Sequence, residues 1–505
     1  MDRSSRGLAR SILSNWGTFV FSAGVNFVLS PFIVRALGQT QYGAWVLLVS
    51  MVGYLGLLDL GVRAAVTRYV AQFHAAGDHD RATLLYASAV RIFSLGGVIA
   101  ILISAVMALL VGRVFNVPPE LIHTARIVAL LGGVNVAVSL VSGVYGGVLI
   151  GLERFDYYNA TEIAVGAVRA IGIVVALRSG YGLIALSLVQ LAATLVRGAA
   201  NVYFTRQLYP QLKIASLVWD SQSAQLIFKF GLSASFLHVT GSLMLYSDSL
   251  VIGAFLPIGM VTYFAIAGNL TDYARSVCSG ISQTLTPRMS ALQAGGREHA
   301  LESAVLMSAR LSSLVVMPIA VTLMLRGGSF IGLWMGAEYA DLSGRVLLVL
   351  AVPLLFLAGY QVVAAAMFGI SKHGGLIPIF ALEAFSNLVL SIFWVRAYGV
   401  IGTAMGTTIP RVIVSTLIGP WYVRRTMGLS LRTFWISCFL QPIAAMIPFA
   451  AASYAVERMW PANNMLVYFA QVLALLPLVA LFAWLICFSR DEQRALKQLV
   501  ARRPS

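Results

Sequence analysis

Charged residues are scarce in this sequence, because Asp, Glu, Lys and Arg together account for only 11% of the 505 residues, whereas 59% are hydrophobic. A soluble protein of this length needs far more charge to cover its surface. The sequence also lacks a long polar segment, since only short connections separate its apolar runs. Separate soluble domains are therefore excluded, and the predicted fold is an all-α, polytopic bundle in a membrane.

Motifs for catalysis or metal binding are also missing. The three cysteines, Cys278, Cys438 and Cys487, lie in apolar runs, and their spacing fits neither a disulfide framework nor a metal cluster. The sequence has no nucleophile elbow, Walker loop, metal-ligand spacing or dinucleotide fingerprint. We therefore expect no enzymatic activity, no bound metal and no organic cofactor.

Acidic residues are few, with 19 Asp and Glu against 35 Lys and Arg, which gives a formal net charge of +16. A basic protein can bind nucleic acid, but this requires a soluble basic face, and none is predicted here. We therefore expect no nucleic-acid partner. The basic excess instead favours positively charged cytoplasmic loops and an anionic substrate.

About fourteen apolar runs are long enough to be predicted as transmembrane helices. They cover about residues 11–34, 41–66, 84–111, 121–150, 157–177, 181–205, 224–255, 260–288, 303–325, 342–369, 374–395, 398–423, 432–455 and 464–488. The first run exceeds the apolar core of a signal peptide, so we expect it to remain as the first helix. The distribution of Lys and Arg between the connections predicts that both termini are cytoplasmic, and twelve spans would satisfy the same rule.

The sequence repeats itself in two halves. LGQTQYGAW at residues 37–45 matches IGMVTYFAI at 258–266, and the YGLI at Tyr181 matches the YGVI at Tyr398. Because six predicted spans separate equivalent segments, both halves have the same orientation, and such parallel repeats build a central cavity between two lobes. The predicted parts are an N-lobe at residues 1–223, a C-lobe at 224–425, and two extra helices with a short tail at 426–505.

Charged residues at membrane depth indicate the working centre of a transporter. The stretch Leu57–Val70, LLDLGVRAAVTRYV, places Asp59 and Arg63 four residues apart, so both are predicted on one face of the second helix. The second half repeats the arrangement with Asp272 and Arg275. Ionisable groups in a bilayer are costly and usually face the interior of a bundle or a wet cavity.

The embedded charges are net basic. The arginines at this depth are Arg63, Arg91, Arg126, Arg169, Arg197, Arg275, Arg310 and Arg411. The acids are Asp59, Glu162, Asp248, Asp272 and Glu383. A cavity with this excess of guanidinium groups suits a phosphate-bearing substrate, because a guanidinium group donates two parallel hydrogen bonds to phosphate oxygens.

Some of these side chains have structural alternatives. Arg126, Arg310 and Arg411 lie near span ends, where snorkelling or structural pairing accounts for them. Tyrosines in the spans would stack on sugar rings if they face the cavity, and would otherwise pack or anchor at the interface. These tyrosines are Tyr54, Tyr145, Tyr246, Tyr263 and Tyr360.

The deeper arginines each have an acid at helical spacing. The pairs are Asp59 with Arg63, Glu162 with Arg169, and Asp272 with Arg275. Such an acid would hold its arginine in place, or would instead relay protons or bind sodium. Asp248 has no basic residue within one helical turn, so it is the candidate for proton or sodium coupling, and a hydrogen-bonded structural acid is the alternative.

Three segments, RALGQTQYGAW, GYLGLLDLGVRAAVTRYVAQ and YSDSLVIGAFLP, resemble the Wzx-like flippases of the multidrug/oligosaccharidyl-lipid/polysaccharide exporter superfamily. The resemblance implies two six-helix lobes, two added helices and a cationic cavity that opens alternately to each side. It further implies that an O-antigen, capsule or exopolysaccharide unit linked to polyprenyl pyrophosphate leaves the cytoplasmic leaflet of a bacterial inner membrane. The implied partners are this lipid-linked oligosaccharide, membrane lipids, a polysaccharide polymerase and glycosyltransferases.

The resemblance also suggests roles for the arginines. Related lipid II flippases carry basic residues on their first, second and eighth spans. Arg63 and Arg275 match the second and eighth spans, but the first span has no deep basic residue here, which argues against lipid II as the substrate. Our hypothesis is that Arg63 and Arg275 bind the pyrophosphate, while Arg91, Arg169 and Arg197 line the path.

Two alternative functions remain open. A multidrug antiporter of the same superfamily would need a cavity dominated by acids or aromatic residues to bind organic cations. A membrane glycan polymerase or ligase would need a sizeable outer loop with catalytic groups, and the predicted connections are short.

Overall fold

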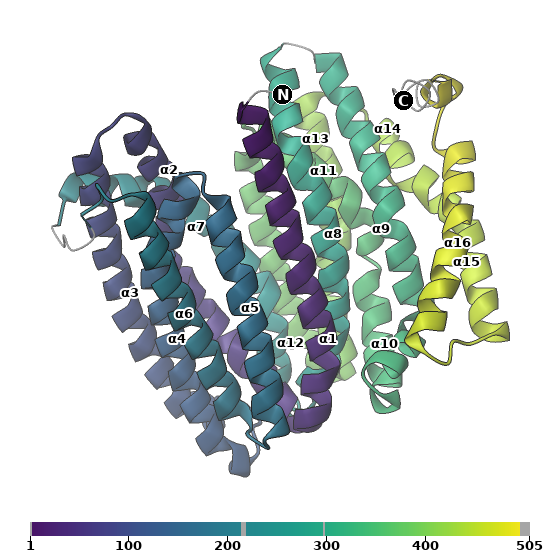
Figure 1. The fold of residues 1–505 in the computed structure, drawn as a ribbon. Helices are drawn as coiled ribbons and strands as arrows, with labels where there is room; N and C mark the ends of the chain where they lie inside the picture. Colours follow the sequence, from purple (N-terminus) through teal and green to yellow (C-terminus); the bar gives the residue numbers. More distant parts are fainter. Residues whose placement is uncertain (1–2, 214–218, 296–297, 495–505) are drawn as a thin grey trace. The chain divides into compact units, whose positions relative to one another are not determined.

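The computed structural model describes residues 3–213, 219–295 and 298–494, and every regular element within them is a helix (Figure 1). In this part of the chain nine helices are long and apolar enough to cross a membrane, or ten if the bent pair Ala337–Ala351 and Leu354–Gly369 is one broken span. The predicted all-α, polytopic membrane bundle is therefore confirmed. The count of fourteen spans is consistent with this architecture and stays a prediction.

The chain forms two compact units, Met1–Thr262 and Tyr263–Ser505. Unit 1 contains α1 (Arg3–Tyr54), η1 (Leu55–Asp59), α2 (Val62–Ala75), α3 (His79–Val114), α4 (Pro119–Gly151), α5 (Phe155–Arg178), α6 (Leu183–Leu208) and α7 (Ser221–Phe255). The next helix, α8 (Met260–Ala294), begins at the end of unit 1 and continues into unit 2. Within unit 1, α7 packs against α1, α2 and α3. The predicted boundaries of the two lobes stay a prediction.

Unit 2 is also helical throughout its described residues. It contains α9 (Glu298–Trp334), α10 (Ala337–Ala351), α11 (Leu354–Gly369), η2 (His373–Gly375), α12 (Leu376–Ile413), η3 (Val414–Ile418), α13 (Gly419–Met427), α14 (Leu431–Trp435), η4 (Ile436–Leu440), α15 (Gln441–Met459) and α16 (Met465–Ile486). The elements η3 and η4 are single π-helical turns, which widen the helices that contain them.

Two glycines divide the longest helices. The backbone is non-helical at Gly38 (φ 70°, ψ 175°) in α1 and at Gly399 (φ 60°, ψ −141°) in α12, so each of these elements is two helices that meet at a glycine. Positive φ is readily adopted by glycine, which lacks a β-carbon. The breaks lie at or next to the predicted connections 35–40 and 396–397, so each long helix supplies two of the predicted spans.

Side-chain caps set several helix starts. Asp78, Asp220 and Asn464 each accept a hydrogen bond from the backbone N–H three residues later, at 3.0, 2.8 and 2.9 Å, where α3, α7 and α16 begin. These bonds satisfy donors that a helix start would otherwise leave unpaired. Hydrogen bonds from Ser223 also lower the pKa of the Asp220 carboxyl below its ordinary value, because they favour the charged form.

The helix α4 is central to unit 1. It packs against α3 and α6, and it also contacts α1 and α2. The outer face of α3 remains exposed and apolar, with Leu95 and Leu102 exposed by 64% and 61%. Such a face suits contact with lipid.

In unit 2, α9 holds the two last helices through a pair of arginines. Arg326 is fully buried and donates to the Glu457 carboxylate of α15 at 2.6 Å and to the Gln471 amide oxygen of α16. Its guanidinium group also lies over the Tyr468 ring, 4.6 Å from the centroid. A buried charge needs such partners, so this arginine fixes α15 and α16 to one end of α9.

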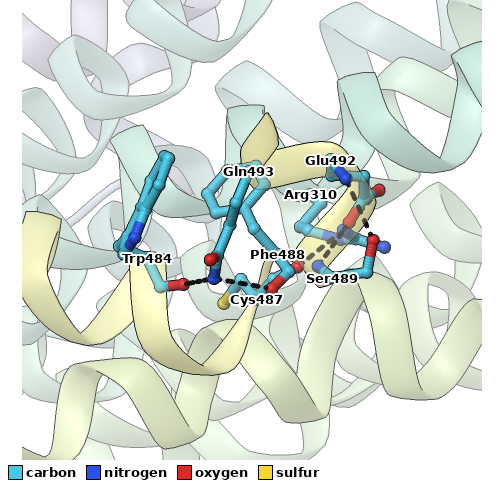
Figure 2. Close-up of polar contacts among 7 residues, drawn as sticks. All are labelled: Arg310, Trp484, Cys487, Phe488, Ser489, Glu492 and Gln493. Carbon is cyan, nitrogen blue, oxygen red and sulfur yellow. Dashed lines mark hydrogen bonds and ion pairs between the residues drawn. The ribbon is translucent and has the colours of Figure 1, made fainter. Parts of the chain in front are cut away.

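Arg310, four to five turns earlier on α9, makes the second attachment (Figure 2). It donates to the Cys487 carbonyl at 2.6 Å and to the Glu492 carboxylate at 3.1 Å. Ser489 and Glu492 exchange reciprocal hydrogen bonds as a capping box, which starts a helical turn after α16. Burial alone would raise the pKa of Glu492, but hydrogen bonds from Ser489 and the charge of Arg310 outweigh burial and lower it. Arg310 therefore pairs structurally, one of the alternatives considered for arginines near span ends.

Candidate functional site

The stretch that was predicted as one helix face is a broken helix. The 3-10 turn Leu55–Asp59 is followed by left-handed backbone at Leu60 (φ 46°) and Gly61 (φ 71°), and α2 begins after it. Left-handed backbone is costly for leucine, so the surrounding packing must hold it. A β-carbon added to Gly231 would lie 2.3 Å from the Leu60 carbonyl oxygen, which shows that the backbone of α7 crosses the break in direct contact.

The break places Asp59 at the end of the 3-10 turn and Arg63 in the first turn of α2. The Asp59 carboxylate accepts a hydrogen bond from the Arg63 backbone N–H at 3.4 Å and lies 3.5 Å from Arg63 Nε. The predicted proximity of the two residues is confirmed, but they lie on either side of a break and not on one continuous helix. The Arg63 side chain is 41% exposed, and the N-terminus of α2 adds positive potential beside it.

A glycine face on α4 makes room for Arg63. Gly143, Gly147 and Gly151 follow one another at four-residue spacing and face α2. The Thr67 hydroxyl of α2 donates to the Gly147 carbonyl at 3.2 Å, so the two backbones lie close together. A β-carbon added to Gly143 would lie 2.7 Å from Arg63 Nη2. The absence of a side chain at Gly143 therefore leaves the space that the guanidinium group occupies.

A second ion pair joins α5 to α6. Arg197 donates to both carboxylate oxygens of Glu162 at 3.4 Å. Glu162, which lies at helical spacing from Arg169, therefore bonds directly to an arginine of the neighbouring helix, while its charge also acts on Arg169. Tyr158 lies close enough to Arg63, Glu162 and Arg197 for all three charges to act on its hydroxyl. We call Asp59, Arg63, Tyr158, Glu162 and Arg197 the charged cluster.

A cavity of about 520 Å³ lies inside unit 1 among α1, α4, α5, α6 and α7. Its polar and aromatic lining consists of Trp45, Asn135, Arg169, Ser187, Gln190 and Tyr246. Arg169 donates to the Gln190 amide oxygen at 3.1 Å, a neutral partner. The volume of the cavity lies within the range of about 300–1,000 Å³ that is typical of ligand sites. We call this space the unit 1 cavity.

The cavity and the charged cluster are joined by polar helix faces. On α6 a polar face runs through Ser187, Gln190, Thr194, Arg197, Asn201 and Thr205 at spacings of three and four residues. Gln190 lines the cavity and Arg197 belongs to the cluster, and they lie two helical turns apart, or about 10 Å along the axis. Arg169 and Glu162 have the same separation on α5. The two sites are therefore neighbouring parts of one polar interior.

Two other predicted site residues of unit 1 lie elsewhere. Arg91 is exposed on the face of α3 that also presents Leu95, Val98 and Leu102, which are exposed by 64%, 55% and 61%. This face suits lipid contact, so the position gives no support to its predicted role along the substrate path. Asp248 is buried on α7, close to Tyr54 on α1, and its coupling role stays a prediction.

Unit 2 contains its own group of paired charges. Asp272 and Arg275 are directly bonded on α8, as their spacing predicted. Arg411 donates to Glu383 at 2.8 Å, and both side chains are largely buried. Arg275 and Arg411 together line a small cavity of about 30 Å³ with the hydroxyl groups of Thr271, Thr407 and Thr408. We call Asp272, Arg275, Glu383 and Arg411 the unit 2 cluster.

Sequence reasoning treated Arg411 as a snorkelling or structural arginine and did not connect it with Glu383 or Arg275. A signal for this pair was present in the repeat. In each half, a glutamate on the fifth predicted span pairs with an arginine on the sixth: Glu162 with Arg197, and Glu383 with Arg411. Gly143, Tyr158 and Gln190 were also missed, because single-sequence spacing shows no contact between helices.

The described residues contain no group of three or more His, Cys, Asp or Glu side chains that could hold a metal ion. The charged cluster and the lining of the unit 1 cavity contain three arginines, Arg63, Arg169 and Arg197, and two carboxylates, Asp59 and Glu162. Chemically, this arrangement can hold an anion by exchange of partners, since each guanidinium group has more donors than its carboxylate uses.

Known proteins are similar to this chain in sequence and in fold. The model of a family described as polysaccharide biosynthesis proteins matches residues 8–293. The uncharacterized membrane protein EpsK of Bacillus subtilis is 20% identical over 96% of both chains, and a putative O-antigen transporter of Shigella flexneri is 22% identical over 82% of this chain and 98% of its own length. The inward closed structure of the lipid II flippase MurJ superposes with a TM-score of 0.74 at 12% identity, covering 94% of this chain and 98% of MurJ.

Proposed function

This chain belongs to the family of polysaccharide biosynthesis proteins, and on that premise we propose that it is a flippase for a lipid-linked glycan. The substrate is an oligosaccharide on polyprenyl pyrophosphate, an O-antigen, capsule or exopolysaccharide unit. The protein moves it by alternating access from the cytoplasmic to the outer leaflet of a bacterial inner membrane, with both termini in the cytoplasm. The relative described as a putative O-antigen transporter and the similarity in fold to a lipid II flippase support this proposal.

One observation carries the proposal: the charged cluster and the lining of the unit 1 cavity hold three arginines and two carboxylates, and a second arginine pair lies in unit 2. In a low-dielectric membrane protein such an excess of partly buried cations favours an anionic ligand. Pyrophosphate matches guanidinium groups in charge and in hydrogen-bond geometry. Arg63 and Arg275 are the proposed pyrophosphate ligands, and Arg169 and Arg197 line the path beside Arg63.

The carboxylates make this binding reversible. Arg63 already has Asp59 as a partner at 3.5 Å, and Arg197 has Glu162 at 3.4 Å, so an incoming pyrophosphate exchanges for a carboxylate. Exchange avoids leaving a bare guanidinium group in either state, which lowers the barrier to release. A carboxylate that loses its arginine becomes able to take up a proton or sodium ion, and Asp248 is the further candidate for this coupling.

The multidrug antiporter is the less favoured function. Four of the five embedded acids, Asp59, Glu162, Asp272 and Glu383, are bonded to arginines. Carboxylates with arginine partners are poor sites for organic cations. A polymerase or ligase is disfavoured because the connections between described helices are short, as between α5 and α6.

The test is transfer of a fluorescent polyprenyl-pyrophosphate oligosaccharide across proteoliposome membranes, with and without a proton or sodium gradient. Wild-type protein is expected to transfer the lipid, and Arg63→Ala and Arg275→Ala to reduce the rate at least 10-fold. Arg126→Ala, which removes an exposed arginine of α4, is the matched control and is expected to retain the rate. Full transfer by both the Arg63 and the Arg275 variants would contradict these roles, and uptake of organic cations without glycan transfer would establish the antiporter.

A further inference from the structure

We propose that the unit 1 cavity is a sugar subsite that receives the glycan residue next to the pyrophosphate and thereby reads the identity of the glycan. The inference rests on the proposed function, and it adds a part of the substrate and three residues without an earlier role, while Tyr246 was among the tyrosines considered for sugar stacking. Trp45, Tyr246, Asn135 and Gln190 are its proposed ligands.

The chemistry of the lining matches a sugar ring. A pyranose has an apolar face of C–H groups and an equatorial belt of hydroxyl groups. Trp45 and Tyr246 offer large flat rings with a polar edge, which suit the C–H face. The amides of Asn135 and Gln190 and the Ser187 hydroxyl supply donors and acceptors for the hydroxyl belt.

Two polar groups in the lining are incompletely used. The Asn135 amide oxygen is buried and has no hydrogen-bond partner among the described residues. Buried acceptors without a donor are rare in folded proteins, so a ligand hydroxyl or a water is expected there. Gln190 accepts from Arg169 at 3.1 Å, which turns its amide N–H groups away from the arginine and leaves them for another acceptor.

Glycines keep the space open. A β-carbon added to Gly53 would lie 2.4 Å from the Tyr246 ring, so this glycine lets the ring pack against α1. A β-carbon added to Gly56 would meet no atom within 4 Å, although Gly56 lines the cavity. The cavity is thus an open volume, with Trp45 and Gly56 along the α1 and η1 wall and the Tyr246 ring on the α7 wall. A larger residue at Gly56 would fill it without displacing the backbone.

The position relative to the charged cluster suits a sugar joined to a phosphate. On three helices, cavity residues lie seven or eight positions from cluster contacts: Asn135 from Gly143, Arg169 from Glu162, and Gln190 from Arg197. Two helical turns correspond to about 11 Å. A ligand whose pyrophosphate lies at Arg63 can therefore place its first sugar in the cavity. An isoprenoid chain is a poor occupant, because Arg169, Asn135 and Gln190 would lose hydration without gaining hydrogen bonds.

The test compares two lipids in proteoliposomes: the lipid-linked glycan isolated from the source organism, and the same polyprenyl pyrophosphate without sugar. The measured quantity is the transfer rate of the lipid-linked glycan divided by the transfer rate of the sugar-free lipid. Gly56→Phe, which fills the cavity, and Asn135→Leu, which removes the amide with little change in volume, are each expected to lower this ratio at least 10-fold. Gly17→Phe is the matched control, since Gly17 also lies on α1 with no atom within 4 Å of its β-carbon position, outside the cavity.

The outcomes separate the two proposals. If wild-type protein transfers the glycan lipid and both cavity variants keep the wild-type transfer rates of both lipids, the sugar subsite is overturned while the flippase stands. If the transfer rates of both lipids fall by the same factor in the cavity variants, the cavity binds the pyrophosphate and the sugar assignment is again overturned. If wild-type protein transfers neither lipid, the proposed function fails and the subsite fails with it.

A second readout does not depend on transport or on the folding of variants. A glycan lipid with a photoreactive diazirine on its first sugar is bound to wild-type protein, irradiated, and mapped by peptide mass spectrometry. Adducts on the α1 segment with Trp45 or the α7 segment with Tyr246 are expected. Adducts confined to helices outside the cavity would overturn the proposal.

Discussion

Gly143 lies directly against the guanidinium group of Arg63, so closely that an added β-carbon would approach Nη2 to 2.7 Å. The position of the best candidate for pyrophosphate binding therefore depends on the absence of a side chain on α4. This relationship links a packing feature, the glycine face of α4, to the charge that the proposed transport requires.

Gly143→Ala is expected to slow glycan transfer roughly 10-fold or more, because displacement of a binding group by about 1 Å is enough to cost this much. The folded state should not suffer from helix propensity, since alanine is favoured over glycine in a helix by about 0.5–1 kcal/mol. Proteoliposome transfer and the thermal unfolding midpoint in detergent are the measurements. Gly17→Ala, at an open position, is the control, and equal transfer by the two variants would contradict a positioning role for Gly143.

Gly61→Ala is expected to destabilise the protein more than Gly77→Ala. Both glycines have φ of +71°, so both substitutions carry the cost of about 1–2 kcal/mol for left-handed backbone. Only at Gly61 does an added β-carbon meet another backbone, the Gly231 carbonyl oxygen at 2.6 Å, and overpacking adds about 1–3 kcal/mol. Thermal unfolding of the two variants measures the difference. Equal midpoints would show that α7 does not hold the break.

Glu383→Gln is expected to destabilise unit 2 by about 3–5 kcal/mol, because it removes the buried carboxylate that is bonded to Arg411. The double variant Glu383→Gln with Arg411→Met removes both charges and should recover much of this loss. The exposed pair Asp341 and Arg345 is the control, where Asp341→Asn should change stability by less than about 1 kcal/mol. Thermal unfolding in detergent measures all three, and a double variant no better than the single one would argue against a buried ion pair.

The bond between Arg310 and Glu492 is expected to weaken in acid. The pKa of Glu492 is lowered in the folded protein, so its carboxylate contributes stability at neutral pH, and this is lost as the pH falls through that lowered pKa, below the ordinary value of about 4.3. Glu492→Gln should cost about 0.5–1 kcal/mol at pH 7 and progressively less below pH 4. Unfolding midpoints across this range, with Asp491→Asn at a 93% exposed position as control, measure it. A cost that is constant with pH would contradict the ionic contribution.

The membrane-spanning helices and their charges were predictable from sequence. Long apolar runs with few charges exclude a soluble fold, and a lipid environment requires backbone hydrogen bonds within each segment, which makes those runs helices. Local spacing also predicted the proximity of Asp59 to Arg63 and of Asp272 to Arg275, because residues three or four apart remain neighbours through a helix and, for Asp59, even across a break.

Contacts between helices were not predictable in this way. Glu162 pairs with Arg197 on α6 and not with Arg169 on its own helix, and Arg91 faces the apolar side of α3. Both outcomes depend on how each helix is rotated about its axis and how far it slides along its neighbour. Periodicity in a single sequence shows which residues share a face, but it does not show what that face meets.

The sequence by itself therefore determined the class of this protein, a multi-pass helical membrane protein with a net basic interior, because burial of apolar length and the cost of embedded charge act on composition and spacing alone. Only the tertiary structure decided the break at Leu60, the place of Arg63 against Gly143, and the cavity beside Gln190. These features arise where backbones from distant segments touch, so their cause lies in packing between helices and not within any one of them.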